Sequence, residues 1–207
     1  MAERAHPDDP GFQHRLILRW RRKIIPWVAV RRSPYREALF WRYNWAKKRC
    51  RGRDVLDIPC GMGWGTSMLV GCRSLVGTDI DIGAIQEAGR RFGNRAHFCV
   101  EDMRALSFGD CSFDVVVCLE GIEHVPCEVG NAFIREAARV LRPEGKLLLS
   151  SPSCSSGEHS GNEFHLHEYE PKEIEGLISQ HFEVDSVQVR EVGPLLVHYF
   201  QSEKRTT

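Results

Sequence analysis

The sequence contains neither a long hydrophobic run nor the closely spaced cysteines of a metal site. No stretch reaches the roughly 18 apolar residues that a membrane-spanning helix needs. The first residues include Glu3, Asp8 and Asp9 and do not resemble a secretory signal peptide. The eight cysteines are scattered without a C-x-x-C pair, whereas zinc sites favour ligands at short spacing. We therefore expect a cytoplasmic protein with reduced thiols and no bound metal.

The chain also lacks net charge, because 28 Lys and Arg balance 28 Asp and Glu, but the charges are unevenly distributed. Residues 1–53 hold 15 of the basic residues, only 4 of the acidic ones and four of the five tryptophans. A chain of 207 residues suits one domain with a short appendage. The asymmetry predicts a basic, Trp-rich N-terminal extension over residues 1–34 and a domain over residues 35–207.

Strand and helix patterns alternate from residue 54 onward. The run from Phe113 to Leu119 is apolar nearly throughout, as in strands that a parallel sheet buries on both faces. We expect Asp81 to cap one helix, Pro171 to begin another, and a further helix to begin at Thr66. The pattern predicts a doubly wound α/β sheet. The predicted strands are 55–58, 74–78, 96–100, 113–119 and 146–150, with 182–192 and 195–200 as an antiparallel pair at one edge.

A glycine-rich loop follows the first predicted strand, with Gly61 and Gly63 at its centre. The third glycine of the dinucleotide fingerprint is missing, because Thr66 stands at its position, and no G-K-[ST] of a phosphate-binding loop is present. Asp57 instead places a carboxylate beside the loop. A carboxylate suits a cationic, phosphate-free cofactor and would repel a pyrophosphate.

Acidic residues also follow the second and third predicted strands. Asp79 lies 22 residues beyond Asp57, close to the offset of about 20 at which a carboxylate accepts hydrogen bonds from ribose hydroxyls. Asp102 and Met103 follow the third strand. There a carboxylate can accept from an adenine amino group while a thioether packs on the ring.

These motifs, in this order, resemble the class I S-adenosylmethionine-dependent methyltransferase superfamily. The run Phe113–Val125 resembles its fourth-strand motif, and Arg139–Leu147 resembles a later one, with the usual glycine pair reduced to Glu144-Gly145. Pro59 replaces a more frequent glycine. The resemblance covers roughly residues 40 to 185. It implies a Rossmann-like, seven-stranded sheet with the last strand antiparallel and S-adenosyl-L-methionine as cofactor.

The resemblance further implies where the cofactor lies. The glycines of the loop would approach its methionine portion, Asp79 would hold the ribose, and the residues after the third strand would face the adenine. Tyr43, in a run that resembles an R-Y-x-[FW]-A pattern, would close over the cofactor. The residues expected to bind it are Tyr43, Asp57, Pro59, Gly61, Gly63, Asp79, Ile80, Asp102, Met103, Leu119 and Glu120.

Two histidines are candidates for catalysis. A hydroxyl acceptor needs a base, and histidine is the commonest choice. His124 would lie next to the methyl group, although it could equally orient its loop. His165 lies in the run Asn162–Tyr169, which resembles the N-P-F-H-x-x-E-[FY] segment of a bacterial subgroup related to ubiquinone-type and sugar-modifying methyltransferases, with Glu163 in place of the proline. It could contact the acceptor or make structural hydrogen bonds. Residues 153–169 are expected to form a lid over the acceptor.

The expected function is therefore S-adenosylmethionine-dependent methyl transfer to a small-molecule acceptor, directed to oxygen, such as a sugar, a quinone-like compound or a secondary metabolite. The alternatives are an RNA-binding methyltransferase, for which the sequence lacks an Asn-Pro-Pro-Tyr-like motif, and a catalytically silent cofactor-binding scaffold. Residues 12–32 carry apolar residues at helical spacing among arginines. Three interpretations stay open for them: a helix packed on the domain, a peripheral membrane anchor toward a lipid-linked acceptor, and a nucleic-acid surface.

Overall fold

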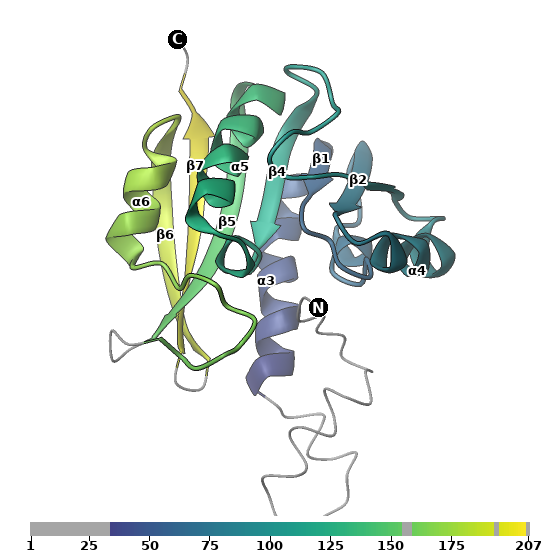
Figure 1. Cartoon of the computed structure of the whole chain (residues 1–207). Coiled ribbons are helices and arrows are strands. Elements are labelled where there is room, and N and C mark those ends of the chain that lie inside the picture. Colours follow the sequence, from purple (N-terminus) through teal and green to yellow (C-terminus); the bar gives the residue numbers. More distant parts are fainter. Residues whose placement is uncertain (1–33, 155–158, 193–194, 206–207) are drawn as a thin grey trace, which may run out of the picture.

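The computed structural model describes residues 34–154, 159–192 and 195–205. The predicted extension therefore lies outside the described residues except for Pro34, and so does part of the predicted lid. Seven strands form one sheet in the order β3-β2-β1-β4-β5-β7-β6 (Figure 1). The strands are β1 (Asp54–Asp57), β2 (Ser74–Asp79), β3 (His97–Val100), β4 (Phe113–Leu119), β5 (Leu141–Cys154), β6 (Phe182–Val192) and β7 (Leu195–Lys204).

The direction of the strands confirms the predicted topology. Strands β1 to β5 pair in parallel, whereas β7 runs antiparallel to both β5 and β6. All carboxyl ends of the parallel strands therefore meet at one edge of the sheet, where ligands of open α/β folds bind. The helices are α3 (Pro34–Cys50), α4 (Ile82–Phe92), α5 (Cys127–Val140) and α6 (Pro171–Ile178), with the 3₁₀ turns η1 (Thr66–Met68) and η2 (Ile122–His124).

Neighbouring residues along the central strands belong to two separate hydrophobic cores. Leu56 and Val116 pack with residues of α5 and α6, which lie side by side on one face of the sheet (Figure 1). Val55 and Val115 point the opposite way and pack with residues of α3. The near-continuous apolar runs of these strands follow from this arrangement, because a sheet covered on both faces buries every position.

Two of the predicted helix starts are confirmed. The Asp81 side chain accepts a hydrogen bond from the backbone N–H of Ala84 at 2.8 Å and so caps α4. Pro171 stands in the first turn of α6, which also has a capping box between Glu170 and Glu173. None of the helices in the described part of the chain is long and apolar enough to cross a membrane.

The helix predicted to begin at Thr66 is wrong in extent, because η1 is a single three-residue turn. The chain leaves this turn at once: Gly71 adopts a positive φ of 87°, and its carbonyl accepts a hydrogen bond from Gly52 N at 2.7 Å. Strand β2 then begins at Ser74, which leaves no room for further helical turns.

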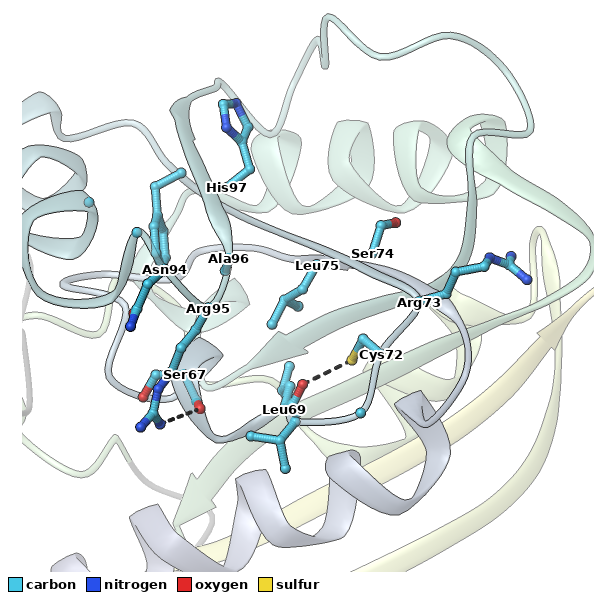
Figure 2. A pocket seen from close by; sticks show the side chains of 15 residues that line it. Ser67, Leu69, Cys72, Arg73, Ser74, Leu75, Asn94, Arg95, Ala96 and His97 are labelled. Carbon is cyan, nitrogen blue, oxygen red and sulfur yellow. Dashed lines mark hydrogen bonds between the residues drawn. The ribbon is translucent and has the colours of Figure 1, made fainter.

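A cavity of about 720 Å³ lies beside η1 and the amino ends of β2 and β3 (Figure 2). Its lining includes Leu69, Cys72 and Arg95, and the Arg95 guanidinium donates to the Ser67 carbonyl at 3.3 Å. The cavity lies at the edge opposite the carboxyl ends of the strands. None of the residues predicted to bind the cofactor or to act in catalysis lines it.

Candidate cofactor and acceptor site

The two central glycines of the loop after β1 have different surroundings. Both take positive φ, 53° at Gly61 and 74° at Gly63. A Cβ at Gly63 would lie 2.8 Å from the Ala88 Cβ and from the Phe98 ring, whereas a Cβ at Gly61 would meet nothing within 4 Å. Gly63 is therefore required by packing inside the protein, and Gly61 borders open space that a ligand can enter.

Asp79, at the carboxyl end of β2, connects that strand to the glycine-rich loop. Its Oδ2 accepts a hydrogen bond from Gly61 N at 2.9 Å, and its Oδ1 accepts one from Asp81 N at 3.0 Å. An ionised carboxylate has about four acceptor positions. Asp79 is only partly buried and can therefore accept further hydrogen bonds from ribose hydroxyls without losing its hold on the loop.

Asp57, at the end of β1, is completely buried. Its Oδ2 accepts a hydrogen bond from the Thr66 hydroxyl at 2.6 Å and lies 3.5 Å from the Tyr43 hydroxyl, whereas its Oδ1 has no partner among the described residues. Burial raises the pKa of Asp57 to about 7. The carboxylate thus fastens the loop from inside, and its contact with a cofactor stays a prediction.

Tyr43 reaches the same loop from α3. Its ring is buried, and a Cβ added at Gly65 would come within 2.0 Å of it. Glycine at position 65 therefore lets the tyrosine pack flat against the loop backbone. Tyr43 lies at the loop as its motif implied, and its closure over a cofactor stays a prediction.

The other predicted cofactor residues lie at the expected strand ends but in varied environments. Asp102 pairs with the Arg104 guanidinium at 2.5 Å. Met103 is 8% exposed and belongs to the core beneath α5, so its contact with adenine would need a small adjustment. Ile80 is 67% exposed. Leu119 is buried, and Pro59, which follows a cis peptide bond, packs against Gly121 after β4.

The end of β4 carries a second set of polar groups. Glu120 Oε2 lies 2.5 Å from the Arg42 guanidinium of α3, and both side chains are largely buried. Glu123, in η2, is fully buried, and neither of its carboxylate oxygens has a hydrogen-bond partner in the part of the chain that the structure describes. Burial raises the pKa of Glu123 well above its ordinary value, and the charge of Glu120 adds to this effect. Arg42 and Glu123 lie within runs that the sequence analysis singled out, but neither was among the predicted site residues.

The structure brings His124 and His165 together. Their ring centroids are 5.1 Å apart. His124 Nδ1 lies 2.9 Å from the Phe164 carbonyl oxygen, and His165 Nδ1 lies 2.5 Å from Glu168 Oε1. The backbone N–H of Leu166 donates to the Glu123 carbonyl at 2.8 Å. The segment from residue 159 to 169 is thus bound directly to η2, which places both candidate catalytic residues in one cluster.

Comparisons with known proteins agree with this geometry. Residues 55–145 match the family model of a methyltransferase domain. A probable S-adenosylmethionine-dependent methyltransferase of Mycobacterium tuberculosis is 34% identical over 142 residues, which are 66% of this chain and 50% of that protein. A ubiquinone biosynthesis O-methyltransferase of Xanthomonas oryzae is 36% identical over 117 residues, 53% of this chain and 47% of that protein. The chain thus spans about half the length of these curated relatives.

The fold is shared with solved methyltransferases. The N-methyltransferase NodS of Bradyrhizobium japonicum, solved in complex with S-adenosyl-L-homocysteine, superposes with a TM-score of 0.70 over 95% of this chain and 98% of that one. At 16% sequence identity this likeness concerns the fold alone. The sequence matches show that the chain belongs to the class I S-adenosylmethionine-dependent methyltransferase superfamily, as the resemblance of its motifs implied.

Proposed function

We propose that this protein transfers the methyl group of S-adenosyl-L-methionine to an oxygen atom of a small-molecule acceptor, such as a sugar, a quinone-like compound or a secondary metabolite. The observation that carries the proposal is the open space at Gly61 beside the Asp79 carboxylate, at the carboxyl edge of the sheet. The similarity to an O-methyltransferase of ubiquinone biosynthesis supports oxygen as the methylated atom.

In this proposal the cofactor occupies the ends of β1, β2, β3 and β4. Gly61 approaches its methionine portion, Asp79 accepts hydrogen bonds from the ribose, and Asp102 and Met103 face the adenine. Asp57 and Gly63 hold the loop that makes this contact, as their burial and packing indicate. Tyr43, Pro59, Ile80, Leu119 and Glu120 complete the proposed cofactor surroundings.

The acceptor lies against His124 and His165 in the same proposal. Its oxygen attacks the methyl carbon, the bond from that carbon to sulfur breaks, and S-adenosyl-L-homocysteine leaves with the electron pair. The hydroxyl proton passes to a base at this cluster. A methyl sulfonium is already reactive, so the protein contributes mainly alignment of the acceptor and exclusion of water. The segment 153–169 serves as the cover of this side.

The role of residues 12–32 rests on sequence alone. Their arginines and tryptophans support contact with an anionic membrane surface that presents a lipid-linked acceptor. Sedimentation of the full chain with anionic vesicles, compared with a chain lacking residues 1–33, tests this contact. Binding to vesicles by the full chain but not by the shortened chain would support the membrane contact. Binding to RNA instead, lost steeply on added salt, would contradict it.

Calorimetry with S-adenosyl-L-methionine and S-adenosyl-L-homocysteine tests the central proposal. We expect the wild-type chain to bind both, and we expect Asp79→Ala to bind them about tenfold or more weakly, because a hydrogen bond to a charged group contributes about 1.5–3 kcal/mol. Asp110→Asn changes an exposed aspartate paired with Arg139 and should bind as the wild type does. A correctly folded wild-type chain that binds neither compound would contradict the proposal.

A further inference from the structure

Three side chains on the acceptor side converge within the span of a metal coordination sphere. Glu123, His124 and His165 each offer one ligand atom, and these atoms all lie within 4.8 Å of one another. Glu123 and His124 belong to η2, whereas His165 is contributed by the segment after β5. The hydrogen bond from Leu166 N to the Glu123 carbonyl joins this segment to η2.

The Glu123 carboxylate is suited to bind a cation. Glu123 is fully buried, and its two oxygens lack any hydrogen-bond partner within the described residues. Arg42, whose charge acts on Glu123, is already engaged by Glu120. Isolated buried carboxylates are costly, and in proteins they are normally paired, protonated or bound to metal ions. A cation between Glu123 and the histidines would remove this cost.

The histidines are oriented as metal-binding histidines usually are. The Phe164 carbonyl can only accept, so the Nδ1 of His124 carries the hydrogen and its lone pair stands on Nε2. His165 Nδ1 faces the Glu168 carboxylate, which itself accepts from Ser160 N at 2.8 Å. A carboxylate or carbonyl behind each imidazole fixes its tautomer and the orientation of its ring.

We propose that Glu123, His124 and His165 bind one divalent transition-metal ion, such as Zn²⁺ or Mn²⁺. Two imidazoles and one carboxylate suit such ions, and three protein ligands leave at least one coordination position open. If the proposed function holds, a metal ion there would bind the acceptor hydroxyl and lower its pKa, and the hydroxyl proton would pass to water rather than to a histidine. The two histidines then act through the metal ion, and the acceptor is an alcohol or phenol.

A second cluster offers a comparison within the same molecule. Cys127, His167 and Glu173 also place ligand atoms within 4.8 Å of one another. Glu173 is exposed, and its Oε1 already lies 2.9 Å from His167 Nε2. This cluster therefore lacks the buried carboxylate without a partner that distinguishes the first one, and it serves as the control.

The test is metal binding by the full chain after treatment with a chelator. Calorimetric titration with Zn²⁺ and with Mn²⁺, together with the visible absorption of added Co²⁺, should reveal one ion per wild-type chain. Glu123→Gln, which keeps the shape of the side chain, and His165→Ala should each bind at least about tenfold more weakly. His167→Ala, in the second cluster, and His97→Ala, an exposed histidine at the start of β3, should bind as the wild type does.

Three results would overturn the metal site: a folded wild-type chain that binds no ion, unchanged binding by Glu123→Gln and His165→Ala, or binding that His167→Ala abolishes. Binding of S-adenosyl-L-homocysteine by the metal-free chain is measured in parallel. A chain that binds the ion but not the cofactor product would contradict the proposed function and leave the metal site standing. A chain that binds the cofactor product but no ion would contradict the metal site and leave the proposed function standing.

Discussion

The two sides of the sheet's carboxyl edge differ in how their carboxylates are satisfied. On the cofactor side, at the ends of β1 and β2, both oxygens of Asp79 accept backbone hydrogen bonds. On the acceptor side, which borders the end of β4 and comprises η2 and residues 159–169, both oxygens of Glu123 lack partners among the residues that the structure describes. The cofactor side is therefore preorganised by the protein itself, whereas on the acceptor side the proposed metal ion would be the partner of Glu123.

Each side also holds one fully buried carboxylate whose pKa is raised by burial. Asp57 keeps one hydrogen bond from Thr66, and its pKa rises to about 7. Glu123 has no such bond from the described residues, and its pKa is raised well above the ordinary value. The comparison indicates that the hydroxyl groups of Thr66 and Tyr43, which both face Asp57, partly offset the cost of its burial. Substitutions on the two sides can test it.

Asp57→Asn should have the largest effect, through the pH dependence of stability. The folded pKa of Asp57 is about 7 against an ordinary value of 3.8, so the folded state binds the proton more tightly than the unfolded state. The wild type therefore loses stability as the pH rises from about 4 to about 7, whereas the amide of the variant cannot titrate. The free energy of unfolding of the variant, relative to the wild type, should rise by about 4 kcal/mol over this range.

Urea-induced unfolding at a series of pH values measures this difference. Because other titrating groups are common to both chains, their contributions cancel in the comparison. If the difference in free energy of unfolding between Asp57→Asn and wild type stays constant across this pH range, the pKa of Asp57 is not raised by folding. The comparison of the two buried carboxylates would then fail for Asp57.

Arg42→Met should have the next largest effect. The substitution leaves the largely buried Glu120 without its cation, and removing one partner of a buried ion pair costs about 3–5 kcal/mol. Because the Arg42 and Glu120 side chains remain 11% and 23% exposed, we expect about 3 kcal/mol, the low end of that range.

Arg73→Met is the matched control for Arg42→Met. Arg73 pairs with Asp54 at 2.5 Å and with Asp114 at 2.7 Å, but its side chain is 59% exposed. Arg142 pairs with the same two carboxylates and stays in place when Arg73 is replaced. Exposed pairs contribute about 1 kcal/mol or less. Denaturant unfolding of both variants at neutral pH measures the difference, and equal losses would mean that the acceptor side is as well solvated as the surface.

The positions of most residues on the cofactor side could be predicted from the sequence because these residues lie at the carboxyl end of a strand or just after it. Asp57, Asp79 and Asp102 stand at the ends of apolar runs, and parallel strands bring such ends to one edge. The antiparallel direction of the last strand, β7, was likewise confirmed. The helix at Thr66 was wrong because apolar periodicity does not reveal how early Gly71 turns the chain toward β2.

The acceptor side could be predicted only in part, because its contacts join residues far apart in the chain. Arg42 meets Glu120 from a helix that precedes the sheet, and His165 meets His124 from a segment after β5. The motifs predicted His124, His165 and Glu120 as site residues. They did not reveal that Glu123 is buried without a partner, because burial depends on how the segment 159–169 covers η2.

The smallest expected effect distinguishes the two glycines of the loop. Both have positive φ, so alanine at either position costs about 1–2 kcal/mol of backbone strain. Only at Gly63 would the new Cβ also meet Ala88 and Phe98 at 2.8 Å, which adds an overpacking cost of about 1–3 kcal/mol. Gly63→Ala should therefore be about 2 kcal/mol less stable than Gly61→Ala in denaturant unfolding.

Cofactor binding by the same two variants completes the comparison. Gly61→Ala places a methyl group in the open space beside Asp79, so it should weaken S-adenosyl-L-homocysteine binding about tenfold or more while the protein stays folded. If Gly61→Ala binds as the wild type does, the ligand does not approach the loop there. The open space at Gly61 would then be solvent, and the preorganisation of the cofactor side would serve the stability of the loop rather than recognition.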